Sequence, residues 1–461
     1  MDDLLAARSQ MAVSLAFHIV FAAIGIGLPL MMVISEWRWL RGGERVHLEL
    51  TRAWAKGAAI FFAVGAVSGT VLSFELGLLW PRFMEYAGSL IGMPFSLEGF
   101  AFFTEAIFLG IYLYGWQRVR PWAHWWAGVV VAISGALSAL FVLSVNGWMN
   151  APTGFTPGAN RPLDIDPLAA MANAFWIANT VHMMIAAYLA TAFGAASVHA
   201  WMLLRDPLNL FHRKALRIAL ALGGVMALAQ PISGDFNARL VHRLQPAKLA
   251  AMEGQFATER CAPLRIGGVP FPAEGVTRWA LEIPCGLSLL AAHDADAEIL
   301  GLDAFPADER PDPRIVHPAF QIMVGIGLFL VALTLWYGLL AWRRREPADS
   351  PAFLRCLVAA GPLAFIAIEA GWVVTEVGRQ PWIIYGVMRT SEAVTPMPGL
   401  VVPFTLFTLL YLLLSFIVAY LLVRQVAQAP RFRIAHAEPE TSDGPEPGAS
   451  PGVEGAPQRD R

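Results

Sequence analysis

Long apolar stretches recur nine times along the chain, separated by shorter polar segments. A helix needs about 20 mostly apolar residues to cross a bilayer, so each stretch predicts one membrane-spanning helix. The predicted spans cover about residues 10–35, 54–80, 97–116, 122–145, 174–203, 216–233, 317–342, 353–376 and 400–423. The pattern therefore predicts an all-α, polytopic membrane bundle of nine transmembrane helices.

Two segments lack this apolar pattern. Residues 234–316 contain Asp, Glu and Pro with few apolar runs, and they predict a long loop that holds a small folded element or a lid. The tail, residues 426–461, is rich in Pro, Gly, Glu and Ser and predicts disorder. The chain thus divides into spans one to six (1–233), the loop (234–316), spans seven to nine (317–425) and the tail (426–461).

Positive charge in the short connections predicts the orientation of the bundle. The segments that follow spans one, three, five and seven carry 15 Lys and Arg, whereas the opposite side carries five. Cytoplasmic loops carry the excess of Lys and Arg. We therefore expect the N-terminus outside and the C-terminus inside, which agrees with an odd number of spans.

Composition narrows the class of protein further. Of the 461 residues, 56% are hydrophobic and 15% are charged, which is too little charge for the surface of a soluble domain. The formal net charge is −2, so no basic field indicates a nucleic-acid partner. Three Cys residues do not supply a zinc ribbon or a disulfide scaffold.

Seven ionisable side chains fall inside the predicted spans, where a charge costs about 2.5–3.5 kcal/mol and usually serves a function. They are His18, Glu75, Glu98, Glu105, His182, Glu369 and Glu376. Several of them, together with Met323, lie at a similar depth in the outer half of the bilayer. Buried His and Met with carboxylates and no Cys suit haem iron better than zinc or copper.

Each of these residues also has a plainer interpretation. A single His in a span is more often a hydrogen-bonded interior residue, and a single Met is more often core filler. A Glu in a span can simply bond a neighbouring helix. The shared depth, rather than any one residue, favours a cofactor site.

Seven sequence blocks, in order, resemble subunit I of the cytochrome bd-type quinol oxidases over nearly the whole chain apart from the tail. The blocks are RSQMAVSLAFH (8–18), SLEGFAFFTEA (96–106), LSVNGWMN (143–150), TVHMMIAAY (180–188), KLAAMEG (248–254), IMVGIG (322–327) and GWVVTEVGRQPW (371–382). The last block is very specific. The nine-span arrangement of that family, with the N-terminus outside, agrees with the pattern above.

The resemblance implies three haems and a ligand role for five residues. His182 and Met323 resemble the axial pair of a low-spin haem b. His18 and Glu376 resemble the proximal ligands of two high-spin haems, one a haem b and the other a haem d or a further haem b. Glu98 resembles the carboxylate that faces the haem on His18. Which high-spin haem occupies which pocket is left open.

Other matching residues resemble the machinery for protons and electrons. Glu105, with Ser138 and Asn146, resembles the proton path of the family toward the oxygen site. Trp372 resembles an aromatic residue between the haems. Arg379 is expected to meet haem propionates or to support the loop.

The loop contains the quinol-contacting pair of the family, which Lys248 and Glu253 match. We hypothesise that quinol docks under the loop and that Glu253 accepts a proton from it. From residue type alone, the pair would instead be an exposed i, i+5 charged pair on a loop helix. Arg8, at the start of the first block, is counted among the cofactor-binding residues.

The chain also departs from the family pattern. Gln321 stands where an Arg is often found two residues before the ligand Met, which removes a cation near the low-spin haem. The loop resembles the short form, which indicates the cyanide-insensitive branch of the family. Cys261 and Cys285 either form a disulfide or remain two free thiols, and their spacing alone does not decide.

The resemblance implies a terminal oxidase in the bacterial inner membrane. It oxidises ubiquinol or menaquinol at the outer face and reduces O2 to water, generating a proton motive force without copper or pumping. The resemblance implies subunit II as the partner. It also allows small single-span accessory subunits. Two alternatives are a proton-coupled transporter and a haem b membrane anchor of a quinone-linked dehydrogenase. The reduced absorption spectrum, with and without carbon monoxide, separates the three.

Overall fold

The chain folds into a bundle of long helices, described by a computed structural model for residues 2–158, 161–428 and 432. Within these residues nine helices are long and apolar enough to cross a membrane, which confirms the predicted number of spans. They are α1 (Asp3–Gly42), α2 (Arg45–Leu79), α3 (Pro81–Tyr114), α4 (Pro121–Asn150), α6 (Trp176–Arg205), α7 (Leu210–Leu244), α10 (Pro313–Trp342), α11 (Pro351–Val377) and α13 (Val401–Ala427).

Most of these helices extend beyond the predicted spans, because a hydropathy window detects only the part that lies in lipid. The largest difference concerns the loop: residues 234–244 continue α7, so the prediction that the loop begins at 234 is wrong as a helix boundary. An i, i+4 ion pair between Arg239 and Asp235, with an N–O distance of 2.7 Å, supports this polar helical end. The predicted tail starts inside the last turn of α13, and almost all of it lies outside the described residues.

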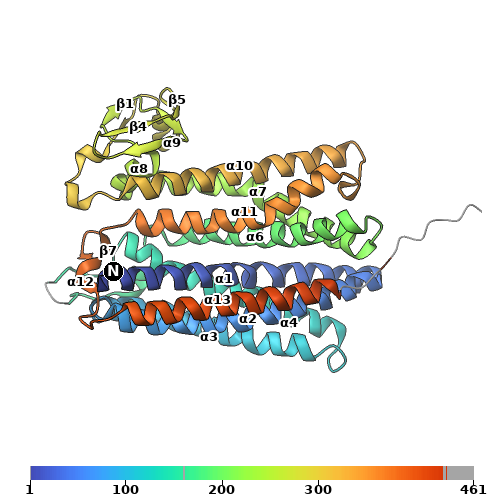
Figure 1. Cartoon of the computed structure of the whole chain (residues 1–461). Coiled ribbons are helices and arrows are strands. Elements are labelled where there is room, and N and C mark those ends of the chain that lie inside the picture. The colour runs from blue at the N-terminus through green and yellow to red at the C-terminus, as the bar shows by residue number, and fades with distance from the viewer. Residues whose placement is uncertain (1, 159–160, 429–431, 433–461) are drawn as a thin grey trace, which may run out of the picture.

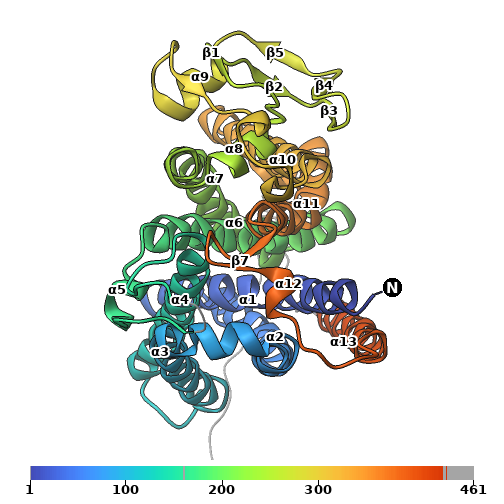
Figure 2. The same cartoon turned by 90° about the vertical axis from the view of Figure 1, so that its left-hand side faces the viewer.

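The long helices run side by side, with the N-terminus at the same end of the bundle as the folded loop (Figure 1). We call this end the loop end. Figure 2 looks at the loop end and shows α6, α7, α10 and α11 on one side of α1, α2 and α3 on the other, and α4 beside α1 between α3 and α6. Helix α1 contacts α2, α4, α6 and α13, so it joins the two groups of helices.

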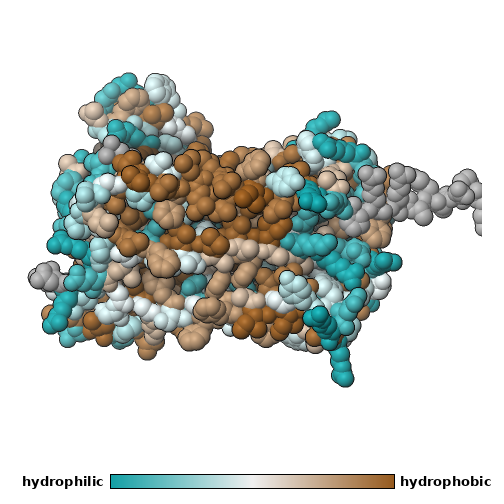
Figure 3. Space-filling view, turned by 60° about the horizontal axis from the view of Figure 1, so that its bottom comes forward, coloured by the Kyte–Doolittle hydropathy of each residue, from teal (hydrophilic) through white to brown (hydrophobic). Residues whose placement is uncertain are grey.

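On the face drawn in Figure 3, apolar side chains form a band across the middle of the bundle, and hydrophilic residues gather toward both of its ends. Exposed Leu, Phe and Ile on α3 and α13, such as Phe100, Ile107 and Leu412, contribute to the apolar surface. Such a band is the surface that a bilayer requires. The chain is therefore a multi-pass membrane protein.

The segment between α7 and α10 is a small folded element, and its strands and α9 lie over α8 and α10 (Figure 2). It departs from an all-α fold, because it contains three antiparallel strand pairs besides its helices α8 (Pro246–Glu253) and α9 (Gly286–Ala292). The pairs are β1 (Glu259–Arg260) with β6 (Glu298–Ile299), β2 (Leu264–Ile266) with β5 (Leu281–Ile283), and β3 (Val269–Phe271) with β4 (Val276–Arg278). A disulfide joins Cys261 to Cys285, which resolves the question that their spacing left open.

Short elements complete the loop end. Helix α5 (Pro167–Met171) lies between α4 and α6, and helix α12 (Thr390–Ala393) precedes α13. Strands β7 (Trp382–Ile384) and β8 (Met388–Arg389) pair directly after α11.

The first residue of α1, Asp3, connects α1 to the start of α13. The Asp3 carboxylate accepts hydrogen bonds from the backbone N–H groups of Gly399 (3.0 Å) and Leu400 (2.9 Å). These groups lie at the start of α13, where backbone N–H groups have no partner within the helix. The contact therefore joins the start of α1 to the start of α13.

Candidate functional site

His18 lies on the face of α1 that packs against α2. Its Nδ1 atom is 2.9 Å from the Ser68 hydroxyl, so the other ring nitrogen is left for another partner. Gly69 gives the ring room, because a Cβ atom there would lie 3.0 Å from the His18 Cε1 atom. Two turns and one turn before His18, Gln10 (3.0 Å) and Ser14 (2.8 Å) both donate to one carboxylate oxygen of Glu75. The second oxygen of that buried carboxylate has no partner among the described residues.

Glu98 and Glu105 share one face of α3, which packs against α4. Ser138 donates to Glu98 Oε1 at 3.1 Å. The Glu105 carboxylate lies against Gly135, where a Cβ atom would come within 3.3 Å of its Oε2 atom. The structure thus pairs Ser138 with Glu98 rather than with Glu105, which differs from the grouping that the resemblance implied.

His182 is oriented by α7 in the same way as His18 is by α2. The Nδ1 atom of His182 is 2.9 Å from the Ser233 hydroxyl, and the Gln230 amide nitrogen lies 3.2 Å from its Nε2 atom. Gly234 faces the ring edge, since a Cβ atom there would be 3.6 Å from the His182 Cε1 atom. A His that bonds a fixed partner through one nitrogen presents the other in a defined direction.

Met323 lies where α10 packs against α11. A Cβ atom at Gly371 would come within 3.0 Å of the Met323 sulfur, so this glycine leaves the thioether room. The next residue, Trp372, has a buried indole N–H without a partner among the described residues. Helices α7 and α11 each contact both α6 and α10, so His182 and Met323 belong to one group of four helices.

Glu376, at the loop end of α11, is the most extensively bonded of the candidate carboxylates. Asn146 donates to its Oε1 atom at 2.6 Å, and Arg379 forms an ion pair with its Oε2 atom. Arg379 is buried, and its second terminal nitrogen has no partner among the described residues. The expectation that Asn146 belongs with Glu105 is therefore replaced by a direct bond to Glu376.

A chain of hydrogen bonds joins this carboxylate to the loop helix α8. Lys248 Nζ donates to Asn150 Oδ1 at 2.7 Å. The Asn150 side-chain amide donates in turn to the backbone oxygen (2.8 Å) and the side-chain oxygen (3.3 Å) of Asn146, which bonds Glu376. Gly378 makes room for the lysine stem, since a Cβ atom there would lie 2.9 Å from its Cγ atom.

The two charged residues of α8 are buried, so the interpretation as an exposed pair is wrong. Lys248 and Glu253 are each 5% exposed. Five residues on a helix correspond to about 140°, so the two side chains leave α8 in different directions. Glu253 Oε2 has no partner among the described residues, which is costly for a buried carboxyl group.

Burial changes the pKa values of both groups. It lowers the pKa of Lys248 to about 7, helped by the positive charge of Arg379 and opposed by Glu376. It raises the pKa of Glu253 to about 8, opposed by the positive charge of Arg265. Perturbed ionisable groups of this kind are typical of functional sites.

A cavity of about 660 Å³, lined by both polar and apolar residues, lies beside this network at the loop end. Asn150, Asn173, Tyr385 and Leu244 are among the residues that line it. Its size lies within the roughly 300–1,000 Å³ range of small-molecule sites. The cavity therefore places one member of the Lys248 chain, Asn150, at the wall of a space that fits a small ring compound.

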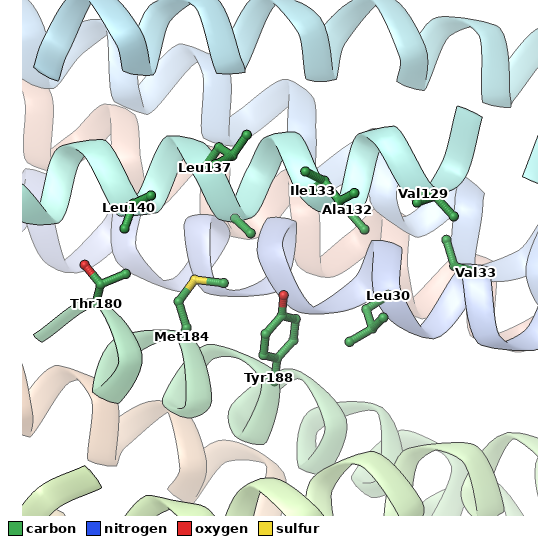
Figure 4. Close-up of a pocket in the computed structure, with 11 residues that line it drawn as sticks. Leu30, Val33, Val129, Ala132, Ile133, Leu137, Leu140, Thr180, Met184 and Tyr188 are labelled. Carbon is green, nitrogen blue, oxygen red and sulfur yellow. The ribbon is translucent and has the colours of Figure 1, made fainter. Parts of the chain in front are cut away.

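A second cavity, of about 370 Å³, lies among α1, α4 and α6 within the apolar part of the bundle. Figure 4 shows Leu137, Met184 and Tyr188 among its lining side chains. It is almost entirely apolar, and none of the candidate ligands lines it. It does not belong to the site described above.

Some predicted residues take a different place. Arg8 is exposed on the first turns of α1. Arg379 bonds Glu376 and the backbone oxygen of Trp382 (3.3 Å), as part of the loop end. Sequence reasoning missed Ser68, Ser233 and Asn150. Each is a small polar residue within a span or at its end, and only its partner distinguishes it from ordinary helix packing.

The structure also bears on which metal chemistry these residues suit. Among the described residues, no three His, Cys, Asp or Glu side chains gather closely enough to hold a bare metal ion. The candidate donors instead lie singly on separate helices, several beside a glycine that leaves space. Isolated axial donors with room around them fit the two faces of a porphyrin.

Comparisons with known proteins identify the family. The family model for cytochrome bd terminal oxidase subunit I matches residues 6–430. A putative cytochrome bd menaquinol oxidase subunit I from Bacillus subtilis is 38% identical over 436 residues, covering 93% of this chain and 98% of that protein. Cytochrome bd-II ubiquinol oxidase subunit 1 of Escherichia coli is 28% identical over 493 residues, covering 91% and 95%.

The fold has a solved counterpart in the bd oxidase of Geobacillus thermodenitrificans. The match has a TM-score of 0.89 at 40% identity and covers 93% of this chain and 99% of that one. These similarities rule out the transporter and the dehydrogenase anchor as the primary function. The chain belongs to the cytochrome bd terminal oxidase subunit I family, and is the subunit of a respiratory quinol oxidase that uses haem cofactors, quinol and O2 and pairs with a subunit II.

Proposed function

We propose that five side chains hold the haem irons. His182 and Met323 would hold a low-spin haem b, and His18 and Glu376 would each hold one of the two high-spin haems. Glu98 faces the haem on His18. When bound, the haems take electrons from quinol one at a time and deliver them to O2. Two features support the assignment: the hydroxyl partner on Nδ1 of both histidines, and the space at Gly69 and Gly371.

The serines have a defined task in this proposal. Ser68 and Ser233 each bond Nδ1 of one imidazole and so fix its rotation, which leaves Nε2 as the nitrogen for the iron; in His182 the Gln230 amide also lies beside Nε2. Trp372 and Arg379 supply buried N–H groups without partners, and we assign these to the cofactors as donors. Orphaned donors of this kind are expected where a cofactor accepts them.

The carboxylates on α3 are assigned to protons. Glu105 and Glu98 lie on one helix face, and Ser138 Oγ bonds Glu98 Oε1. A carboxyl group in an apolar setting can take up and release a proton, and a hydroxyl neighbour can pass it on. We infer that these residues carry protons to the oxygen site from the side opposite the loop, which would separate charge without copper or a pump.

Quinol is assigned to the cavity at the loop end. The observation that carries this assignment is the chain Lys248–Asn150–Asn146–Glu376, because it connects the wall of the cavity with the proposed haem ligand. Lys248 orients the Asn150 amide from behind, and that amide forms part of the polar wall. Glu253 does not line this cavity, and its assignment as the group that accepts the proton from quinol rests on its burial and on the resemblance of the α8 segment to the family.

Removing the lysine acceptor is expected to weaken quinol binding. Asn150→Leu leaves the buried Lys248 amine without its bond, which is worth roughly a factor of ten in an equilibrium. We expect KM for a short-chain quinol to rise about tenfold. Steady-state oxygen consumption by the purified complex measures it.

Two further variants sharpen that test. Asn150→Asp keeps an oxygen for Lys248 and is expected to retain most of the affinity. Asn209→Ser, a helix cap at the opposite end of the bundle, serves as the matched control. A wild-type KM in Asn150→Leu would remove Asn150 from the quinol site.

The proposal extends to setting and assembly. The relatives are bacterial, and we infer the inner membrane, with the loop end outside as the charge distribution predicts. The second high-spin haem is a haem d or a further haem b, and the quinol is ubiquinol or menaquinol. Extracted pigments and the CO difference spectrum of the reduced complex test the haem assignment, and a spectrum without a CO-sensitive high-spin component would contradict it.

A further inference from the structure

The turn between β2 and β3 of the loop is held by two side chains of α10. Gln321 accepts a hydrogen bond from the Gly267 N–H (3.0 Å) and donates one to the Arg265 backbone oxygen (3.0 Å). His317 Nε2 lies 2.9 Å from the Gly267 backbone oxygen. His317 and Gln321 are four residues apart and thus share a helix face. Three backbone polar groups of the turn therefore have their partners on one face of α10.

His317 also reaches the other functional part of the loop. Its Nδ1 atom lies 2.7 Å from the backbone oxygen of Met252, the residue before Glu253. The His317 side chain is fully buried. Gly254 permits the contact, because a Cβ atom there would come within 3.4 Å of the His317 Nδ1 atom and 2.6 Å of the Thr277 hydroxyl. One imidazole thus joins the end of α8 to the β2–β3 turn.

The strand that leads into the turn carries a cation, Arg265, whose side chain contacts the segment directly after Glu253. The Arg265 side chain is 14% exposed and bonds Gln255, two residues after Glu253. It also pairs with Glu282, at an N–O distance of 3.0 Å, on the adjoining strand β5. The backbone of Arg265 is fixed by Gln321, and its guanidinium is fixed by the loop. Its position relative to Glu253 therefore depends on how the turn is seated on α10.

We propose that His317 and Gln321 form a clamp that seats the β2–β3 turn on α10 and so fixes the backbone on both sides of Glu253, through Met252 and through the bond from Arg265 to Gln255. They are positioning residues for quinol oxidation, and the inference rests on the role proposed above for Glu253. The clamp also explains why an amide suits position 321, because the Gln321 side chain both accepts and donates a hydrogen bond. An arginine there would donate to the Arg265 oxygen, but it has no acceptor for the Gly267 N–H.

The first test follows the turn itself, independently of activity. In the purified complex, Gln321→Leu should raise hydrogen–deuterium exchange in peptides that span 264–271 about tenfold, because two backbone groups of the turn lose their partners. Gln321→Arg should give a smaller increase, because it keeps a donor for the Arg265 oxygen and loses only the acceptor for the Gly267 N–H. Ile322→Ala, an exposed neighbour on α10, is the matched control and should leave exchange unchanged.

The second readout is kinetic. Gln321→Leu and His317→Gln should raise KM for quinol several-fold or more, while the reduced haem spectrum stays that of the wild type. We choose His317→Gln rather than His317→Phe because glutamine keeps a polar side chain at this buried position, so the variant is expected to fold. Unchanged exchange at 264–271 in Gln321→Leu would overturn the clamp.

The two proposals fail in different ways. If Glu253→Gln oxidises quinol normally, the base assignment is lost, but exchange in Gln321→Leu still tests whether the turn is clamped. If exchange rises and KM for quinol stays constant, the clamp is structural only and the positioning role is overturned.

Discussion

Glu253→Gln is expected to lower the rate of quinol oxidation about 100-fold or more while leaving every haem band in place. The amide has nearly the same shape as the carboxyl group but cannot accept a proton, and general bases contribute about 10²–10⁴ in rate. Oxygen consumption with a short-chain quinol measures the loss. The absorption spectrum of the dithionite-reduced complex shows that the haems remain.

The pH dependence of the wild type provides an independent check. Burial raises the pKa of Glu253 to about 8, so at pH 7 only about one-tenth of the molecules carry the basic carboxylate. The rate at low quinol concentration should therefore rise with pH up to about 8 and then level off. The rise of the rate with pH should be absent in Glu253→Gln.

Glu274→Gln is the matched control for both measurements. Glu274 is an exposed loop carboxylate that pairs with Arg278, and its removal should change neither the rate nor the pH profile. Loss of haem in Glu253→Gln would show that the residue is structural. A wild-type rate would show that another group accepts the proton.

Met323→Leu is expected to abolish the low-spin haem signal and to lower quinol oxidation about 100-fold or more. Leucine replaces methionine at similar volume, so the packing of α10 on α11 should survive. The sulfur ligand is lost, and a haem with one open position becomes high-spin and binds carbon monoxide. Reduced-minus-oxidised and CO difference spectra measure the change.

Met184→Leu is the control, because Met184 lines the apolar cavity shown in Figure 4 and has no proposed ligand role. His182→Ala should reproduce the spectrum of Met323→Leu if the two residues bind the same iron. Retention of the low-spin band in Met323→Leu would exclude Met323 as an axial ligand.

The nine spans were predictable because the bilayer imposes their length and polarity directly on the sequence. The same signal ends at the membrane surface. Residues 234–244 extend α7 through a polar segment, which no hydropathy window registers, and the strand pairs of the loop are only two or three residues long. Local patterns of that size do not distinguish a strand from a turn.

The candidate ligands were predictable because an ionisable side chain in a span is rare. Their partners were not. Asn150 and Ser68 are unremarkable in sequence, and only the packing of α4 on α8 and of α1 on α2 places them beside Lys248 and His18. The burial of Lys248 and Glu253 could not be predicted from the sequence either, because a polar helix in a loop normally lies at the surface.

The contact between Asp3 and the start of α13 has a consequence for biogenesis. Helix α1 precedes α13 in the sequence by most of the bundle, so its leading carboxylate finds both N–H partners only after residues 399 and 400 have been made. Until α13 is in place, α1 lacks one of its neighbours. A fusion partner attached directly at the N-terminus would crowd this closing contact, whereas a premature stop before residue 399 would leave it unmade.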